Sequence, residues 1–292
     1  MKELLEILEP ERVDTDRFCG RTLDLKWGYL FGGQFVAQAL AAAEQTVRED
    51  QAAHSLHGYF LRPGDERKPV SYQVERVRDG KSFAVRRVDA IQDGNPVFTL
   101  TASFHLEEVG FDHQAVMPEM PGPEGLLSQA QIARKYLDRM PDVAAEQLAF
   151  ETAIEIRPID PMNILDPEAK PPLRAIWYRA IGMLPDRPAL HRALLAYASD
   201  LNLLSTAIQP HALTWFAPGM QSASLDHAVW FHRPFRMDEW LLFVMDSPSA
   251  SGARGLTSGR FFTRDGRLVA SAVQEGLIRM RTCPTDESRQ PV

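Results

Sequence analysis

The sequence predicts an α+β fold in which one structural unit occurs twice, each unit being an antiparallel sheet wrapped around a long apolar helix. Two repeated landmarks indicate the duplication. Phe60-Leu61-Arg62-Pro63 recurs as Phe231-His232-Arg233-Pro234, an offset of 234 − 63 = 171 residues. Asp93-Gly94 recurs as Asp265-Gly266, an offset of 266 − 94 = 172 residues. In each half a long apolar helix precedes the Arg-Pro landmark, so we expect two divergent copies of one unit.

The helix of the first copy begins at Gly32-Gly33-Gln34 and continues through residues 35–43, which are rich in alanine. Alanine is the best helix former, and a helix that is apolar nearly all round has to be buried. Asp-Gly turns separate several of the segments that could cover it, and such short turns indicate an antiparallel sheet. The strands are expected at residues 55–61, 70–77, 82–91 and 97–106.

The second copy repeats this plan. A mainly apolar helix is predicted over residues 190–207. Because a single unit would expose a sheet edge, we expect the two sheets to meet edge to edge, which is the double hot-dog arrangement. The strands of this copy are expected at residues 153–157, 175–180, 225–232, 240–245, 255–264 and 268–279.

Prolines and glycines interrupt the chain between the two copies and predict a linker, which then carries one surface helix near residues 131–137. We therefore divide the chain into four parts. These are an N-terminal hot-dog unit at 1–108, a linker at 109–149, a C-terminal hot-dog unit at 150–283, and a tail at 284–292.

Composition predicts an ordinary globular protein with a formal net charge of −7, which argues against a nucleic-acid partner. Cys19 and Cys283 are two isolated thiols near opposite ends of the chain, the usage expected in a reducing compartment. The acidic, interrupted N-terminus does not resemble a secretion signal, and no run has the roughly 18 apolar residues of a membrane span. We expect a cytoplasmic protein.

Several kinds of catalytic site are excluded by their missing motifs. The chain has no Gly-x-Ser-x-Gly elbow, phosphate-binding loop, dinucleotide fingerprint or His-Glu-x-x-His. His54 and His57 would point to opposite faces of a strand, which suits metal chelation poorly. A hydrolase without a metal or a covalent nucleophile must activate water with a carboxylate and polar side chains. We expect no metal and no cofactor.

Asp200 is the first candidate for that role, because it interrupts the apolar run of the second helix. A buried carboxylate is costly unless it is hydrogen-bonded. It is either a general base or an aspartate that faces water at a helix bend. The helix of the first copy has no acid before Glu44, so the two copies differ chemically.

Gln274 and Ser224 are the other candidates. Gln274 interrupts the apolar last strand, where an amide needs a partner, and its counterpart at the 172-residue offset is Ala102. Ser224 stands directly before a predicted strand. Each residue also has a structural interpretation, Gln274 as an amide that satisfies nearby backbone and Ser224 as a turn residue.

Several longer motifs of the chain resemble those of one known protein family. Residues 197–202, 225–227, 230–235 and 273–276 of the second copy, with 31–34, 60–65, 78–83 and 86–88 of the first, resemble the acyl-CoA thioesterase II family over about residues 1–281. The resemblance implies a double hot-dog fold and hydrolysis of fatty acyl-CoA to fatty acid and CoA. It also implies that Asp200, Ser224 and Gln274 hold one water molecule. The resemblance to this family, together with the exposed sheet edges, suggests a homo-oligomer.

Further roles are hypotheses. Backbone N–H groups of Gly32, Gly33 and Gln34 could stabilise an oxyanion, because glycine allows close approach at a helix start. His57 could lie near the site. Basic residues at 78–81 and 86–87 could bind CoA phosphates or simply face solvent. Leu203, Leu204, Phe231 and Met220 could line an acyl channel or pack in the core.

The residues themselves are compatible with two other functions. A duplicated hot-dog protein could bind or sense acyl-CoA without cleaving it. A hydratase is the second alternative, but hydratases of this architecture pair Asp with His near the helix, and no histidine follows Asp200 before His211.

Overall fold

The computed structural model describes residues 1–139 and 153–281. The predicted boundary between linker and second unit, at residues 149 and 150, lies outside the described residues. So do the end of the second unit at 283, with Cys283, and the tail at 284–292.

The first unit is a sheet that wraps the helix α2 (Gly32–Glu44). Ten residues of α2 are buried, which agrees with its apolar composition. The strands show the alternation expected of a sheet with one face on a core, as in the buried-exposed pattern of β5. They are β1 (Glu11–Asp14), β2 (Arg17–Gly20), β3 (Gln51–Phe60), β4 (Val70–Asp79), β5 (Phe83–Gln92) and β6 (Asn95–Leu106).

The second unit wraps the helix α5 (Pro188–Ser199) in the same way. Both Asp-Gly landmarks lie in hairpins, Asp93-Gly94 between β5 and β6 and Asp265-Gly266 between the last two strands. The strands of this unit are β7 (Ile154–Pro158), β8 (Leu173–Ala180), β9 (Met220–Ser224), β10 (Asp226–Phe231), β11 (Leu241–Ser251), β12 (Arg254–Thr263) and β13 (Leu268–Met280).

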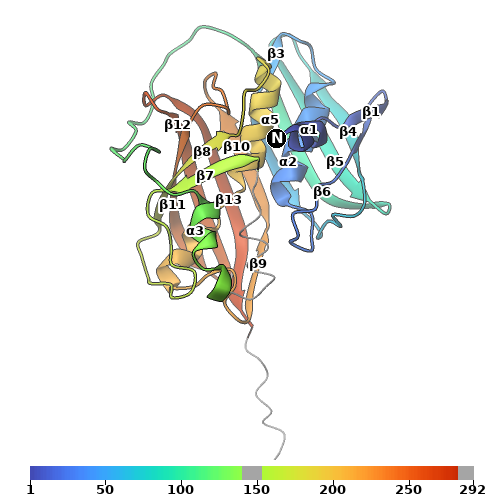
Figure 1. Cartoon of the computed structure of the whole chain (residues 1–292). Helices are drawn as coiled ribbons and strands as arrows, with labels where there is room; N and C mark the ends of the chain where they lie inside the picture. Colours follow the sequence, from blue (N-terminus) through green and yellow to red (C-terminus); the bar gives the residue numbers. More distant parts are fainter. Residues whose placement is uncertain (140–152, 282–292) are drawn as a thin grey trace, which may run out of the picture.

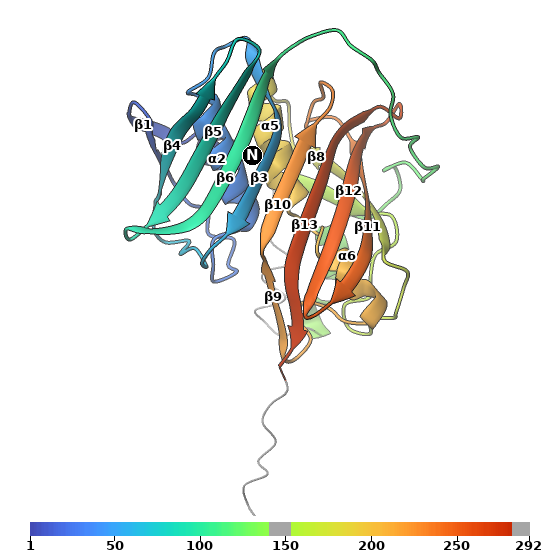
Figure 2. The same cartoon turned by 180° about the vertical axis from the view of Figure 1, so that it is seen from behind.

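The two sheets meet along β3 and β10, which pair antiparallel from Tyr59 opposite Asp226 to Ser55 opposite Trp230 (Figures 1 and 2). The result is one continuous 13-stranded sheet in the described chain. Its order is β1-β2-β4-β5-β6-β3-β10-β13-β12-β11-β8-β7, with β9 on β13. The predicted fold class is confirmed, and the edge-to-edge junction of the two units is this strand pair.

The two helices pack against each other on the inner side of this sheet, and one hydrophobic core contains residues of both units. The contact is very close at Gly33, where a Cβ would stand 2.4 Å from the carbonyl oxygen of Tyr197. Glycine is therefore required where α2 crosses the end of α5.

Shorter helices complete the described chain. The surface helix expected in the linker is α3 (Gln129–Arg134), which begins with a capping box formed by Ser128 and Gln131. The others are α1 (Lys2–Leu8), α6 (Ser205–Ile208) and the 3₁₀ turns η1 (Leu137–Arg139) and η2 (Gln209–His211).

The single helix predicted over residues 190–207 is wrong in one respect, because the chain leaves the helix after Ser199 and resumes helical structure only at Ser205. Asn202 adopts a left-handed conformation with φ of 64° in the intervening turn. The phenol of Tyr178 donates a hydrogen bond of 2.8 Å to the carbonyl oxygen of Leu201. This tertiary contact satisfies a carbonyl that a continuous helix would use internally.

Candidate active site

The three residues singled out from the sequence meet at one point. The side-chain nitrogen Nε2 of Gln274 donates to Asp200 Oδ1 at 2.6 Å and to Ser224 Oγ at 2.8 Å. Gln274 is fully buried, whereas Asp200 and Ser224 are partly accessible. Because both amide protons of Gln274 are engaged, the Ser224 hydroxyl accepts from Gln274 and keeps its own proton for another acceptor.

Each residue comes from a different element. Asp200 is the C-cap residue of α5, so it lies at the helix end and not inside the helix as predicted. Ser224 is the last residue of β9, not the turn residue that starts a strand. Gln274 lies within β13, opposite Thr257 of β12. The chain bends between β9 and β10 at Leu225, whose N–H donates to the Glu275 carbonyl at 2.9 Å.

The first unit contributes the start of α2 to the same place. A Cβ on Gly32 would stand 2.7 Å from Asp200 Oδ2, so the carboxylate lies directly against this glycine. The first N–H groups of a helix lack intrahelical acceptors and carry partial positive charge, which favours a carboxylate or an oxyanion there. Gln34 faces elsewhere, because its side chain bonds Arg21 and Leu23 of the preceding loop. The prediction for Gln34 concerned its backbone N–H, which already donates to the carbonyl oxygen of Phe31 at 3.1 Å.

Aromatic side chains of the loop before α2 form a wall beside this point. Phe31 packs edge-on against Tyr197 with ring centroids 4.9 Å apart, and Trp27 packs against both Phe31 and Tyr29. Burial, and then the negative charge of Asp200, raise the pKa values of Tyr197 and Tyr29. Both phenols therefore stay protonated at neutral pH. This wall was not predicted from the sequence, although the cluster of three aromatic residues within 27–31 could have indicated it.

His57 is not brought to the three residues. It lies on β3 with buried Leu56 and Gly58 on either side, and its own side chain is 48% exposed. It therefore points to the outer face of the sheet, whereas Gln274 points to the inner face. Its Nε2 lies 3.0 Å from Asp226 Oδ2, and Asp226 Oδ1 accepts the N–H of Glu275.

His227 is a buried residue for which the sequence predicted no role. Its Nε2 lies 2.8 Å from Ser199 Oγ, one residue before Asp200. Burial lowers the pKa of His227, and the charges of Asp200 and Asp226 only partly oppose this effect. A signal existed in the repeat, because the 171-residue offset places His227 on Leu56, an apolar residue in the first copy.

The basic residues proposed for phosphates differ in their surroundings. Arg86 is 1% exposed and donates to Thr46 and to the Arg78 carbonyl oxygen, so it is a structural residue. Arg87 forms an ion pair with Glu75 at 2.5 Å on the exposed face.

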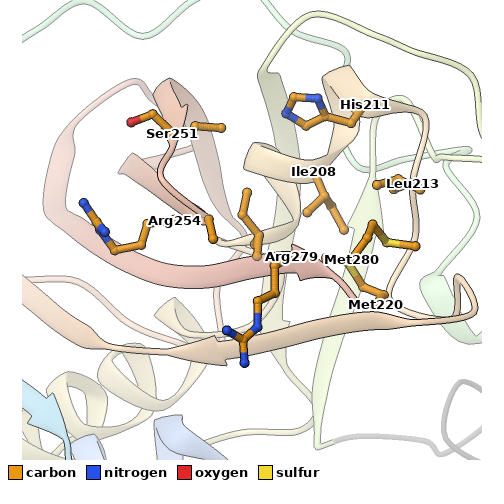
Figure 3. Close-up of a pocket in the computed structure, with 11 residues that line it drawn as sticks. Ile208, His211, Leu213, Met220, Ser251, Arg254, Arg279 and Met280 are labelled. Atoms are coloured by element: carbon orange, nitrogen blue, oxygen red, sulfur yellow. The ribbon is translucent and has the colours of Figure 1, made fainter. Parts of the chain in front are cut away.

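A groove with a mainly apolar lining and polar residues such as Arg254 and Arg279 lies farther along the same strands (Figure 3). Its volume is about 230 Å³, and Met220 of β9 and Ile278 of β13 line it with Ile208 and Leu213. Of the residues expected in an acyl channel, Met220 belongs to this groove. Leu203 and Leu204 are buried in the core, and Phe231 stacks on Phe235.

No cluster of three potential metal ligands from His, Cys, Asp and Glu occurs within residues 1–139 and 153–281. In the same part of the chain, no helix has the length and apolar character needed to cross a membrane. The cytoplasmic location and the homo-oligomer stay predictions.

Known protein families define the class of this protein. Residues 149–277 match the family described as acyl-CoA thioesterase, and residues 23–105 match its N-terminal domain. The chain belongs to the acyl-CoA thioesterase II family, as the resemblance in its motifs implied.

Individual relatives agree over nearly the full length. The chain is 39% identical to acyl-CoA thioesterase 2 of Haemophilus influenzae over 279 residues, covering 96% of this chain and 98% of the relative. It is 42% identical to human acyl-coenzyme A thioesterase 8, covering 94% and 88%. The crystal structure of acyl-CoA thioesterase II TesB2 from Mycobacterium marinum superimposes with a TM-score of 0.76 at 39% identity, covering 95% and 98%.

Proposed function

We propose that this thioesterase hydrolyses fatty acyl-CoA to free fatty acid and CoA at Asp200, Ser224 and Gln274, by direct attack of water. The observation that carries the proposal is the position of the Gln274 amide, which binds both other side chains within 2.8 Å. The arrangement joins a carboxylate, a hydroxyl and an amide, and it needs neither a metal nor a covalent intermediate.

In this mechanism Asp200 accepts a proton from the attacking water, and the Ser224 hydroxyl fixes the direction of attack. Gln274 holds both side chains and so sets the distance between them. Fixing the water against the carbonyl carbon converts the reaction into an effectively unimolecular step, which removes much of the entropic barrier. The thiolate leaves without a strong general acid because thiols are far more acidic than alcohols.

The first unit supplies the oxyanion donors in this proposal. As the tetrahedral intermediate forms, its oxygen becomes negative and needs preorganised N–H groups. The first N–H groups of α2 are those of Gly32 and Gly33, and N–H groups at a helix start have no intrahelical acceptor. Gly32 itself lies against the Asp200 carboxylate. One active centre per chain then uses residues of both units.

The test is release of free CoA from acyl-CoA substrates of increasing chain length by the wild type and by Asp200→Asn. Loss of a general base should lower kcat by roughly 10²- to 10⁴-fold. Asp93→Asn, in an exposed turn, is the matched control and should retain wild-type kcat. Saturable acyl-CoA binding without any CoA release by the wild type would overturn the proposal in favour of a binding module.

A further inference from the structure

His227 lies between the end of α5, which carries Asp200, and the strand β13, which carries Gln274. It lies on β10, is fully buried, and its Nε2 lies 2.8 Å from Ser199 Oγ. The Ser199 hydroxyl donates its only proton to the Ala196 carbonyl oxygen at 2.9 Å. The proton in the second hydrogen bond therefore belongs to the imidazole, so His227 carries a proton on Nε2 and donates to Ser199.

On its other side, His227 is the cross-strand neighbour of Gln274. Ala228 pairs with Val273, so the preceding residue His227 stands opposite Gln274, and both side chains are buried on the inner face. Directly opposite residues have Cβ atoms about 5 Å apart. Among the described residues, His227 Nδ1 and Gln274 Oε1 are two of the few buried polar atoms without a hydrogen-bond partner.

The first unit has apolar residues at the two positions that correspond to His227 and Gln274. Its equivalent pair is Leu56 opposite Ala102, and both are buried apolar residues. The second unit replaces both members of the pair by polar ones. Burying polar atoms that lack partners costs about 1–3 kcal/mol each, so packing alone favours the apolar pair. Exceptions of this kind in a folded core are expected at functional sites.

We propose that His227 is a positioning residue of the active centre. Its Nε2–H ties Ser199 to β10 and so fixes the end of α5 from which Asp200 projects, while its ring packs beside Gln274. The imidazole stays neutral and exchanges no proton with the substrate. This inference rests on the proposed function, because it assigns His227 to the alignment of the same three residues.

The experiment measures kcat and KM for a fatty acyl-CoA, with the melting temperature, for His227→Leu and His227→Gln. His227→Leu installs the residue of the first unit and removes the bond to Ser199. It should lower kcat by roughly 10- to 100-fold, the usual cost of a misplaced catalytic group, and leave KM nearly unchanged. His227→Gln should recover most of that loss, because its amide Nε2 can donate to Ser199 Oγ.

The matched control is His232→Leu. His232 also bonds a serine, with Nε2 2.9 Å from Ser271 Oγ, but it lies beyond the end of β10 and outside the site, so kcat should equal the wild-type value. If His227→Leu does not fold, Ser199→Ala tests the same bond and should show the same selective loss of kcat.

Two results would overturn the positioning role. One is wild-type kcat in folded His227→Leu or, where that variant fails, in Ser199→Ala. The other is a folded His227→Gln as impaired as His227→Leu. A wild type that releases no CoA would overturn the proposed function itself, which is a different outcome from an active wild type with unaffected variants.

Discussion

At the scale of single residues, the proposed site depends on the absence of a side chain at position 32 as well as on its three polar residues. Gly32 belongs to the first unit, and the Asp200 carboxylate of the second unit occupies the space where a Cβ would be. The same Cβ would come within 3.0 Å of the Phe60 ring. Because both neighbours belong to packed elements, a methyl group at position 32 has no free space.

We therefore expect Gly32→Ala to displace the Asp200 carboxylate from Gln274 and to lower kcat by roughly 10- to 100-fold, with a folded protein. Steady-state kinetics and circular dichroism would check both parts. Gly110→Ala is the control, because a Cβ there meets nothing within 4 Å. Unchanged kcat in Gly32→Ala would show that the carboxylate tolerates the methyl group.

At the scale of elements, the antiparallel helices α2 and α5 hold the two units in register. One end of the contact is the approach of Gly33 to Tyr197 described above. The other end is an ion pair in which Arg192 lies 2.8 Å from Glu44 Oε1, with side-chain exposures of 15% and 11%. Burial raises the pKa of Glu44, and Arg192 opposes that shift. The ion pair with Arg192 therefore offsets part of the cost of burying this carboxylate.

Removing one partner should cost more than removing both. Arg192→Met leaves the Glu44 charge buried without compensation and should lower the free energy of unfolding by roughly 3 kcal/mol. The double variant Arg192→Met/Glu44→Gln should recover much of this loss, because no unpaired charge remains. Urea unfolding of the two variants and of Glu44→Gln completes a double-mutant cycle, and a double variant as unstable as Arg192→Met would contradict this account.

At the scale of the whole molecule, folding buries two histidines of the second unit, His227 on β10 and His191 on α5. His227 and His191 are at most 2% exposed, and burial is the largest cause of the lowered pKa of each. The unfolded chain takes up a proton on each imidazole near pH 6.5, whereas the folded protein resists it. The unfolded state then binds more protons, so stability falls as the pH falls below that value.

We expect the free energy of unfolding to decrease when the pH is lowered from 7.5 to 5.5, with a slope of up to about 1.4 kcal/mol per pH unit for a fully buried histidine. Urea titrations at several pH values would measure it. His227→Gln lacks one such group and should show a shallower slope. Equal slopes in the two proteins would rule out a contribution from His227.

The double hot-dog fold could be predicted from the sequence because its evidence is local and repeated. Apolar periodicity, the Asp-Gly turns and the recurring Arg-Pro landmark each depend on residues close together in the chain. The same repeat exposed the asymmetry at Asp200 and Gln274, since Ala102 replaces the amide in the first copy. Local sequence patterns predicted the wrong structure where a contact between distant residues decides it. One example is the end of α5, where Tyr178 of β8 donates a hydrogen bond to the Leu201 carbonyl oxygen.

By itself, the sequence determined the two units, their helices and hairpins, and the residue types that could activate water. Only the tertiary structure decided that Asp200 ends its helix, that His57 faces away from Asp200 and Gln274, that Gly32 lies against the Asp200 carboxylate, and that His227 stands opposite Gln274. The physical reason is that these contacts join residues far apart in the chain, such as Gln274 and Asp200. Their geometry is set by the pairing of β3 with β10 and by the packing of α2 on α5, which no local pattern encodes.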